Sequence, residues 1–225
     1  TSALAGSCDT YFYTVAQRAG IDPLTEMSRR FGFGSVSGLG LPGEKEGLLP
    51  DPLWKQKRYK DRWSVGDTVN AGIGQGYVLA TPLQLAVMTA RIASGRMVQP
   101  RLLTGGESVF KAVDVDLKHL EAVRQGMDAV VNQGYGTAYS KRIIDPAKQM
   151  AGKTGTAQVR KILVRGQDQG KLPWEFRHHA WFVAYAPVQE PRYAICVLVE
   201  HGGGGASAAA PIARDVLHKA QEWKV

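Results

Sequence analysis

The sequence predicts an α/β fold of the α+β type, in which helices flank an antiparallel sheet and a helical subdomain lies beside it. Residues 180–185 and 193–199 are apolar on both faces of an extended chain, as expected of strands in a sheet covered on both sides. Residues 187–192, which join them, are too few for a crossover connection, so the two strands should be antiparallel. Apolar residues elsewhere recur at helical spacing, which predicts the flanking helices.

The composition is that of a folded, basic domain. The chain has 225 residues, and a hydrophobic content of 44% is ample for a packed core. A formal charge of +8 permits an anionic partner but carries no information about the fold. No apolar run approaches the roughly 20 residues that span a bilayer, and the first residues lack the features of a signal peptide. We therefore expect the chain to be part of a longer protein.

Two helices are predicted near the start of the chain. The first covers residues 10–19 and should end at Gly20, a residue type common just after helices. In the second, Asp22 is expected to cap the helix and Pro23 to occupy its first position. The stripe expected to be buried in this second helix consists of Leu24, Met27 and Phe31.

Residues 35–67 are rich in glycine, proline and charge, which predicts a long, mostly irregular loop. Long loops inside compact domains tend to be functional. Positions 54–63 are rich in basic and aromatic residues, a composition found in nucleic-acid-binding strips. A charged loop without a nucleic-acid-binding motif is ordinarily a solvated surface, so we expect no nucleic-acid partner.

The clearest helix signals surround residues 82–94. Thr81 can cap this helix, Gln84 stands where a capping box needs it, and Gly95 should end the helix. Two further helices are expected later in the chain. Their predicted buried stripes are Leu117, Leu120, Val123, Met127 and Val131 in a helix starting at Asp116, and Ile212, Val216 and Ala220 in a closing helix at residues 209–222.

Residues 151–157 combine a lysine, two threonines and two glycines on a predicted strand. Alternation along a strand puts Lys153 and Gly155 on one face and Thr154 and Thr156 on the other, unless local twist brings them together. Gly155 leaves room for a ligand backbone beside the strand. An ammonium group beside hydroxyls predicts a site for an anion.

Separate segments of the chain together resemble the class B penicillin-binding transpeptidases. Lys153, Thr154, Gly155 and Thr156 resemble the third motif of that family, and the segment from Ser7 to Tyr13 resembles the second. Residues 72–76, 81–86, 54–59 and 66–68 are similar to further segments of the elongation-specific members in rod-shaped Gram-negative bacteria. The resemblance covers nearly the whole chain, and the order and spacing of its segments make it more specific than any single motif.

The resemblance implies the fold shared by penicillin-binding transpeptidases and serine β-lactamases, incomplete at the N-terminus. Residues 1–225 would be the C-terminal portion of a single transpeptidase domain. Residues 1–100 would form a mainly helical subdomain, and residues 101–225 would contain the sheet and the closing helix. No metal or other cofactor is expected, because His178 and His179 lack a third ligand at metal-binding spacing.

The resemblance also implies an activity. In the family, a serine attacks the penultimate D-Ala carbonyl of a stem peptide and D-Ala leaves, after which the amine of a neighbouring stem resolves the acyl-enzyme into a cross-link. The implied partners are stem peptides ending in D-Ala-D-Ala, β-lactam antibiotics, a glycan-polymerising membrane partner and cell-elongation scaffold proteins. The implied location is the periplasmic face of the bacterial inner membrane, with the anchor outside this chain.

By resemblance, residues 153–156 form the substrate-binding strand edge. Lys153 would bind the terminal carboxylate of the stem peptide or of a β-lactam, and the hydroxyls of Thr154 and Thr156 would donate beside it. The backbone N–H of Thr156 would supply half of the oxyanion hole. Ser7 would pass a proton toward the leaving amine.

Two departures from the family pattern concern catalysis. Asp9 stands where most members have Asn, and an ionised carboxylate accepts hydrogen bonds but does not donate them. The family's nucleophile lies in a Ser-x-x-Lys upstream of the second motif, so we expect this chain to lack it and not to turn over alone. Ser108 begins a Ser-x-x-Lys, but it follows the second motif, and the order argues against a nucleophile there.

Other interpretations remain open at this point. A D,D-carboxypeptidase, a β-lactamase or a β-lactam sensor would share the three motifs, and a non-enzymatic fragment could bind an anionic polymer through residues 54–63. Lys153 could be a solvated charge at a strand edge. Ser7 or Asp9 could simply cap the helix that begins near residue 10.

Overall fold

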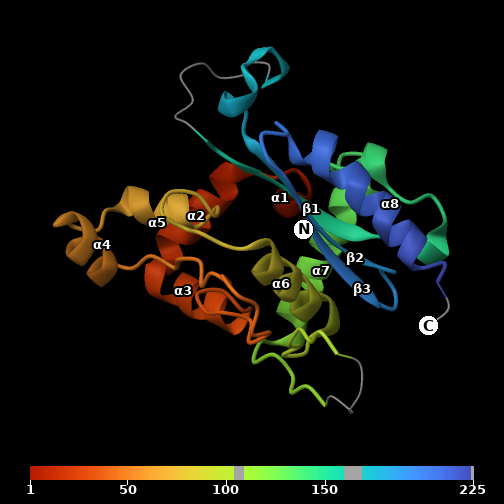
Figure 1. The fold of residues 1–225 in the computed structure, drawn as a ribbon, viewed down its shortest axis with the longest axis horizontal. Coiled ribbons are helices and arrows are strands. Elements are labelled where there is room, and N and C mark those ends of the chain that lie inside the picture. The colour runs from red at the N-terminus through yellow and green to blue at the C-terminus, as the bar shows by residue number, and fades with distance from the viewer. Residues whose placement is uncertain (104–108, 160–168, 224–225) are drawn as a thin grey trace. The chain divides into compact units, whose positions relative to one another are not determined.

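The structure is a computed structural model that describes residues 1–103, 109–159 and 169–223. It divides into two compact units, one formed by Thr1–Ser7 with Asp116–Val225 and the other by Cys8–Val115. We call them the sheet unit and the helical unit (Figure 1).

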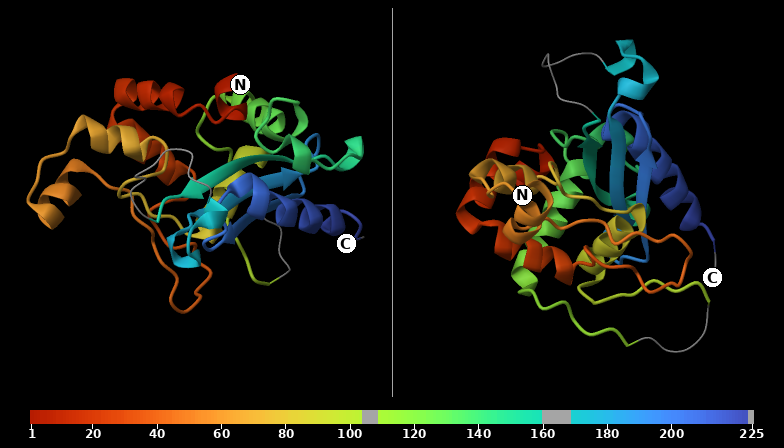
Figure 2. Two further views of the ribbon diagram at one scale, coloured as in Figure 1. Left: turned by 90° about the horizontal axis from the view of Figure 1, so that it is seen from above. Right: turned by 60° about the vertical axis from the view of Figure 1, so that its left-hand side comes forward.

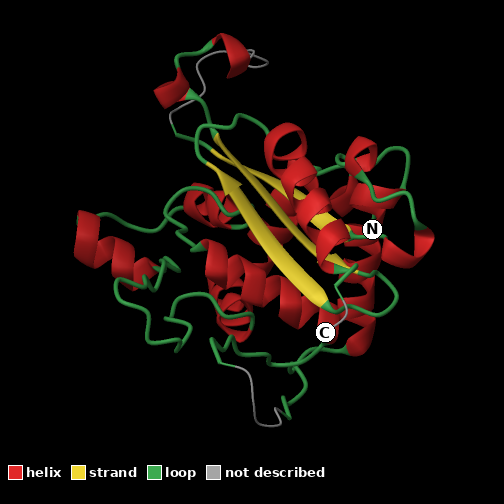
Figure 3. Ribbon diagram, turned by 45° about the vertical axis from the view of Figure 1, so that its right-hand side comes forward, coloured by secondary structure: helices red, strands yellow, loops and turns green. Residues whose placement is uncertain are grey.

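In its described residues the sheet unit has three strands in the order β1-β2-β3, all antiparallel to their neighbours (Figure 3). The strands are β1 (Ala151–Ala157), β2 (His179–Ala186) and β3 (Tyr193–Val199). The helices of this unit are α1 (Ser2–Ala5), α7 (Leu117–Asn132) and α8 (Ala210–Ala220). Short helical turns lie at η1 (Tyr139–Lys141), η2 (Pro146–Lys148), η3 (Gln169–Lys171), η4 (Trp174–Phe176) and η5 (Gly205–Ala209), the last a π-helical turn.

The antiparallel arrangement predicted for residues 180–185 and 193–199 is confirmed. The central strand β2 is buried on both faces, with Phe182 0% and Tyr185 1% exposed, because α7 and α8 cover opposite faces of the sheet (Figure 2). Burial raises the pKa of the Tyr185 phenol to about 12. The strand β1 is an edge of this sheet, and its Lys153 lies opposite Val183 of β2.

The stripe predicted for the closing helix is wrong. In α8 the buried residues are Ala210, Ala213 and Leu217, whereas Ile212 is 45% and Val216 49% exposed. The alanines lie closest to the sheet because small side chains let a helix approach it closely. Two neighbouring stripes of α8 have helical spacing, so periodicity alone could not choose between them.

The helix predicted from Asp116 is confirmed as α7, with Asp116 as its N-cap accepting a hydrogen bond from the Lys118 N–H at 2.9 Å. Leu120, Met127 and Val131 are buried as predicted. The prediction fails for Leu117, which is 71% exposed, and Val123, which is 38% exposed. Leu117 occupies the first helical position, where side chains are least enclosed by neighbours.

The helical unit contains α2 (Asp9–Ala19), α3 (Ile21–Arg30), α4 (Pro52–Tyr59), α5 (Val65–Ala71) and α6 (Pro82–Ser94). The capping box predicted for α6 is present: the Gln84 N–H donates to the Thr81 hydroxyl at 3.1 Å, and the Thr81 N–H donates to the Gln84 side chain at 3.0 Å. The Gln84 amide also donates to the carbonyls of Ser35 and Glu46, so it anchors the preceding loop on α6.

Two predictions for this unit are wrong. The helix α3 starts at Ile21 directly after Gly20, so Asp22 and Pro23 lie inside its first turn rather than at its cap. Ile21 and Thr25 are its buried residues, and Met27 is 40% exposed. Gly20 adopts a φ of 81°, which lets α2 and α3 follow each other with one residue between them and sets which face of α3 packs on α2.

The loop predicted at residues 35–67 is irregular only in its first part. It contains α4 and the start of α5, each with its own side-chain cap. The Asp51 carboxylate accepts a hydrogen bond from the Trp54 N–H at 2.7 Å, and Ser64 and Asp67 form a capping box. These caps supply partners for helix N–H groups that would otherwise be unsatisfied, so short helices form within a stretch rich in charge.

Candidate active site

The Ser7 turn is held within the sheet unit by packing of α1 on α7. Ala5 is fully buried, and its carbonyl accepts a hydrogen bond from the Thr137 N–H at 3.2 Å. Gly126 of α7 lies against Leu4 so closely that an added Cβ would be 2.5 Å from a Leu4 methyl carbon. Ser7 itself has a φ of 52°, a left-handed conformation that is uncommon for serine and is found more often at functional sites.

Lys153 of β1 reaches this turn from 146 residues further along the chain. Its Nζ donates to Ser7 Oγ at 2.8 Å and to the Thr154 carbonyl at 2.9 Å, and lies 3.4 Å from Thr154 Oγ1. The lysine side chain therefore bends along the strand toward the backbone of the next residue. The structure thus brings the second and third motif segments together at Ser7 and Lys153.

Glycines let the chain pack tightly around β1. A Cβ at Gly152 would lie 2.6 Å from both Phe182 and the Val183 carbonyl, and one at Gly155 would lie 3.2 Å from the Trp181 side chain. Gly205 of η5 is tighter still, because its Cβ would be 2.3 Å from the Trp181 carbonyl. The absence of side chains at these positions therefore sets the line of β1 that carries Lys153, Thr154 and Thr156.

Sequence reasoning missed Thr137, which follows α7. Its hydroxyl lies 3.1 Å from Thr154 Oγ1, next to Lys153. The sequence carries no local signal for this role, because the glycine-flanked segment before Thr137 indicates only a turn. Thr137 can contact Thr154 because the chain between α7 and η1 passes next to β1.

The interpretation of Ser7 or Asp9 as a helix cap is wrong. The N-cap of α2 is Cys8, a position that neither Ser7 nor Asp9 occupies. Ser7 instead accepts the hydrogen bond from Lys153. Asp9 is exposed in the first turn of α2 and belongs to the helical unit. Thr156, another predicted site residue, is exposed on β1.

Three histidines have backbone partners in the sheet unit. Nδ1 of His178 accepts from the Val159 N–H at 3.3 Å, Nδ1 of His179 accepts from the His201 N–H at 2.9 Å, and Nδ1 of His201 lies 2.9 Å from the Arg177 carbonyl. Within the described ranges no three His, Cys, Asp or Glu side chains form a group that could hold a metal ion. Ser108 lies outside the described residues.

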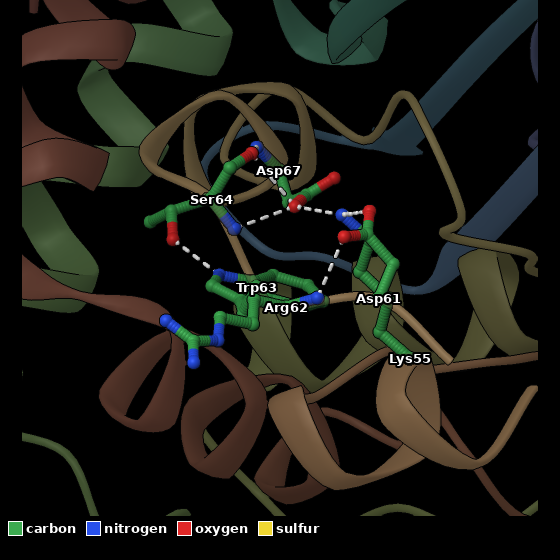
Figure 4. A network of polar contacts seen from close by, with 7 residues as sticks. Lys55, Asp61, Arg62, Trp63, Ser64 and Asp67 are labelled. Atoms are coloured by element: carbon green, nitrogen blue, oxygen red, sulfur yellow. Dashed lines mark hydrogen bonds and ion pairs between the residues drawn. The ribbon is translucent and has the colours of Figure 1, made fainter. Parts of the chain in front are cut away.

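A second polar cluster lies in the helical unit, where Lys55 is only 5% exposed (Figure 4). Its ammonium donates to Asp67 at 2.7 Å and forms an ion pair with Asp61 at 3.2 Å. The hydrogen bond to Asp67 raises the pKa of Lys55. Asp67 also accepts from the N–H and hydroxyl of Ser64, so the cluster fastens α4 to the start of α5.

The comparison with protein families agrees with this geometry. Residues 1–218 match the family described as the penicillin binding protein transpeptidase domain. The chain belongs to this transpeptidase family. The peptidoglycan D,D-transpeptidase MrdA of Haemophilus influenzae is 40% identical over 228 residues, which cover 96% of this chain and 35% of that protein.

Solved structures of penicillin-binding proteins share the fold. The complex between PBP2 and MreC from Helicobacter pylori matches with a TM-score of 0.87 and 38% identity, covering 98% of this chain and 39% of that chain. Pseudomonas aeruginosa PBP2 in complex with WCK 5153 matches with a TM-score of 0.83 and 36% identity, covering 99% of this chain and 49% of that chain. The predicted transpeptidase fold is therefore confirmed, and the chain spans between about a third and a half of these relatives.

The described part of the chain contains no helix long and apolar enough to cross a membrane.

Proposed function

We propose that the full-length protein is a peptidoglycan D,D-transpeptidase that cross-links stem peptides through a serine acyl-enzyme and is acylated by β-lactams. The observation that carries this proposal is the 2.8 Å hydrogen bond from Lys153 Nζ to Ser7 Oγ, which unites two motif segments of the transpeptidase family. The name of the Haemophilus influenzae relative supports the same activity. Residues 1–225 would form the C-terminal portion of one transpeptidase domain.

In this proposal Lys153 binds the terminal carboxylate of the stem peptide through its positive charge. Thr154, Gly155 and Thr156 lie on the same strand, and in this proposal the two threonine hydroxyls line the carboxylate site. Charge-assisted hydrogen bonds are the strong ones, at about 1.5–3 kcal/mol each, so the lysine contributes most of the binding.

In this proposal Ser7 transfers a proton to the leaving group. Because an ammonium group only donates, Ser7 Oγ accepts from Lys153 and its own proton is directed to another acceptor. In acylation, the nucleophilic serine of the upstream Ser-x-x-Lys gives its hydroxyl proton to the lysine of that motif and adds to the penultimate D-Ala carbonyl. The peptide bond then breaks, and this proton passes through Ser7 to the leaving D-Ala amine. Asp9, as a carboxylate, would accept a hydrogen bond from the lysine of that upstream motif.

Stem peptides ending in D-Ala-D-Ala and β-lactams are the proposed ligands. A glycan-polymerising membrane partner and cell-elongation scaffold proteins are the proposed protein partners, supported by the Helicobacter pylori PBP2 structure, which is a complex with MreC. The proposed location is the periplasmic face of the bacterial inner membrane.

The test is the intact mass of the full-length protein and of the 225-residue chain after incubation with benzylpenicillin. We expect an adduct on the full-length protein, mapped to a serine upstream of Ser7, and none on the chain alone. An adduct mapped to Ser108, or no adduct on the full-length protein, would overturn the proposal. Cross-linked product from a stem-peptide substrate separates a transpeptidase from a carboxypeptidase, which would release D-Ala without cross-linking.

A further inference from the structure

We propose that Thr137 is a positioning residue that ties the Ser7 turn and the Lys153 strand to one another through its backbone N–H and its hydroxyl. This inference rests on the proposed function, because it assigns Thr137 a role in keeping Ser7 and Lys153 in reacting geometry. Thr137 belongs to neither motif segment and lies between α7 and η1.

Thr137 makes one contact to each side of the site. Its N–H donates to the carbonyl of Ala5 at 3.2 Å, two residues before Ser7. Its hydroxyl lies 3.1 Å from Thr154 Oγ1, the residue next to Lys153. Thr137 therefore connects the same two segments that the 2.8 Å hydrogen bond between Lys153 and Ser7 joins. Together, the two connections set the distance between the Ser7 and Lys153 side chains and their orientation.

The backbone of Thr137 is held firmly on both sides. The Gly136 N–H donates to the Gln133 carbonyl at 2.8 Å, and the Ala138 N–H donates to the Val130 carbonyl at 3.0 Å. Ala138 is fully buried. Gly136 lies so close to the end of α7 that a Cβ there would be 2.2 Å from the Ala129 carbonyl. The threonine is thus presented from a rigid point, which a positioning residue requires.

The direction of the hydrogen bonds connects Thr137 to the charge of Lys153. Thr154 Oγ1 lies 3.4 Å from the ammonium, which can only donate, so this oxygen is directed to accept from Lys153. The Thr154 hydroxyl proton is then available to Thr137 Oγ1. The Thr137 hydroxyl accordingly fixes the rotamer of Thr154 that faces Lys153.

Thr137 is exposed, so a role limited to the core does not explain its contacts. Replacing its hydroxyl by a methyl group should leave the backbone bond to Ala5 intact, since valine keeps the N–H and the branched shape. The expected effect is therefore on the reaction rather than on folding.

The experiment compares Thr137→Val and Thr137→Ser in the full-length protein, with Ser140→Ala in the neighbouring η1 turn as the control. The second-order rate of acylation by a fluorescent penicillin is measured per folded molecule, and Tm is measured in parallel. We expect Thr137→Val to acylate about 2- to 10-fold more slowly, as for the loss of one neutral hydrogen bond, and Thr137→Ser and Ser140→Ala to remain within about twofold of the parent.

A double-mutant cycle with Thr154→Val tests the connection itself. Once the Thr154 hydroxyl is gone, Thr137→Val should cause no further loss of rate. Equal rates for Thr137→Val and the parent, equal losses for Thr137→Val and Thr137→Ser, or additive losses in the cycle would each overturn the role of Thr137 while leaving the proposed function in place. A parent protein that is not acylated would overturn both.

Discussion

Lys55 of the helical unit and Lys153 of the sheet unit are both hydrogen-bonded lysines in motif segments, but their surroundings differ. Lys55 is 5% exposed and donates to carboxylates of Asp67 and Asp61 (Figure 4). Lys153 is partly exposed, and its bonds to Ser7 and Thr154 are to a hydroxyl and a carbonyl. Carboxylates neutralise an ammonium group, whereas a hydroxyl and a carbonyl orient it as hydrogen-bond acceptors.

This difference separates a structural lysine from a ligand-binding one. In the Lys55 cluster the ammonium pairs with Asp61 and Asp67 and links α4 to the start of α5, so loss of Lys55 should affect stability. Lys153 lies on the edge strand β1 beside Ser7 and Thr154, so its loss should affect binding and reaction. The following changes test that separation in the full-length protein.

The largest effect is expected from Lys153→Ala. Loss of a charge-assisted hydrogen bond to the ligand carboxylate, at about 1.5–3 kcal/mol, should slow acylation by a β-lactam about 10- to 150-fold. Lys153→Arg keeps the charge and should recover part of the rate. Stopped-flow measurement of acylation checks this, and an unchanged rate for Lys153→Ala would contradict a role of Lys153 in binding the ligand carboxylate.

Gly205→Ala is expected to destabilise the sheet unit. Its Cβ would lie 2.3 Å from the Trp181 carbonyl, so η5 or β2 must shift, at a cost of about 1–3 kcal/mol in the free energy of unfolding. Gly134→Ala is the matched control, because a Cβ there meets nothing within 4 Å. Urea unfolding measures both, and equal midpoints for the two variants would contradict the close packing.

Asp67→Asn is expected to lower Tm and to change its dependence on pH. Burial by itself would raise the pKa of the Asp67 carboxyl, but hydrogen bonds from Lys55 and Ser64 outweigh burial and lower it. The pKa of Lys55 is raised by the same bond to Asp67. The variant should leave acylation per folded molecule near the parent value.

A carboxyl whose pKa is lowered on folding stabilises the protein above its unfolded pKa, near 4, and this contribution is lost as pH falls through the folded value. Lys55 contributes below its ordinary pKa, about 10.4, and its contribution is lost as pH rises through the raised value. The parent should therefore lose stability on both sides of this window. Thermal unfolding from pH 3 to 11 should show a flatter acid limb for Asp67→Asn, and identical limbs would contradict the assignment.

The smallest effect concerns the two thiols, one in each unit. Burial raises the pKa of Cys196 to about 12, whereas Cys8 is exposed and its pKa is lowered, chiefly by its hydrogen bond with Thr10. At pH 8 a thiol reagent should label Cys8 rapidly and Cys196 only after denaturation. Mass spectrometry of the labelled peptides checks this, and fast labelling of Cys196 in the native protein would contradict its partial burial and raised pKa.

Local signals were sufficient for much of the fold and for the motif residues. The capping box of Thr81 and Gln84 predicted the start of α6, and the continuous apolar runs predicted β2 and β3, because these signals act within a few residues. The segments at Ser7 and Lys153 were recognised instead by their resemblance to the motifs of the transpeptidase family. Residue types and spacing carried that information without any knowledge of contacts.

Long-range packing set the rest. Which stripe of α8 faces the sheet depends on how closely the alanines approach β2 and β3, and two stripes of that helix had the same spacing. The contact of Lys153 with Ser7, and the contact of Thr137 with Thr154, join residues far apart in the chain. A hydrogen bond depends on distances of a few ångströms between atoms, and sequence spacing does not specify those distances for segments that meet only after folding.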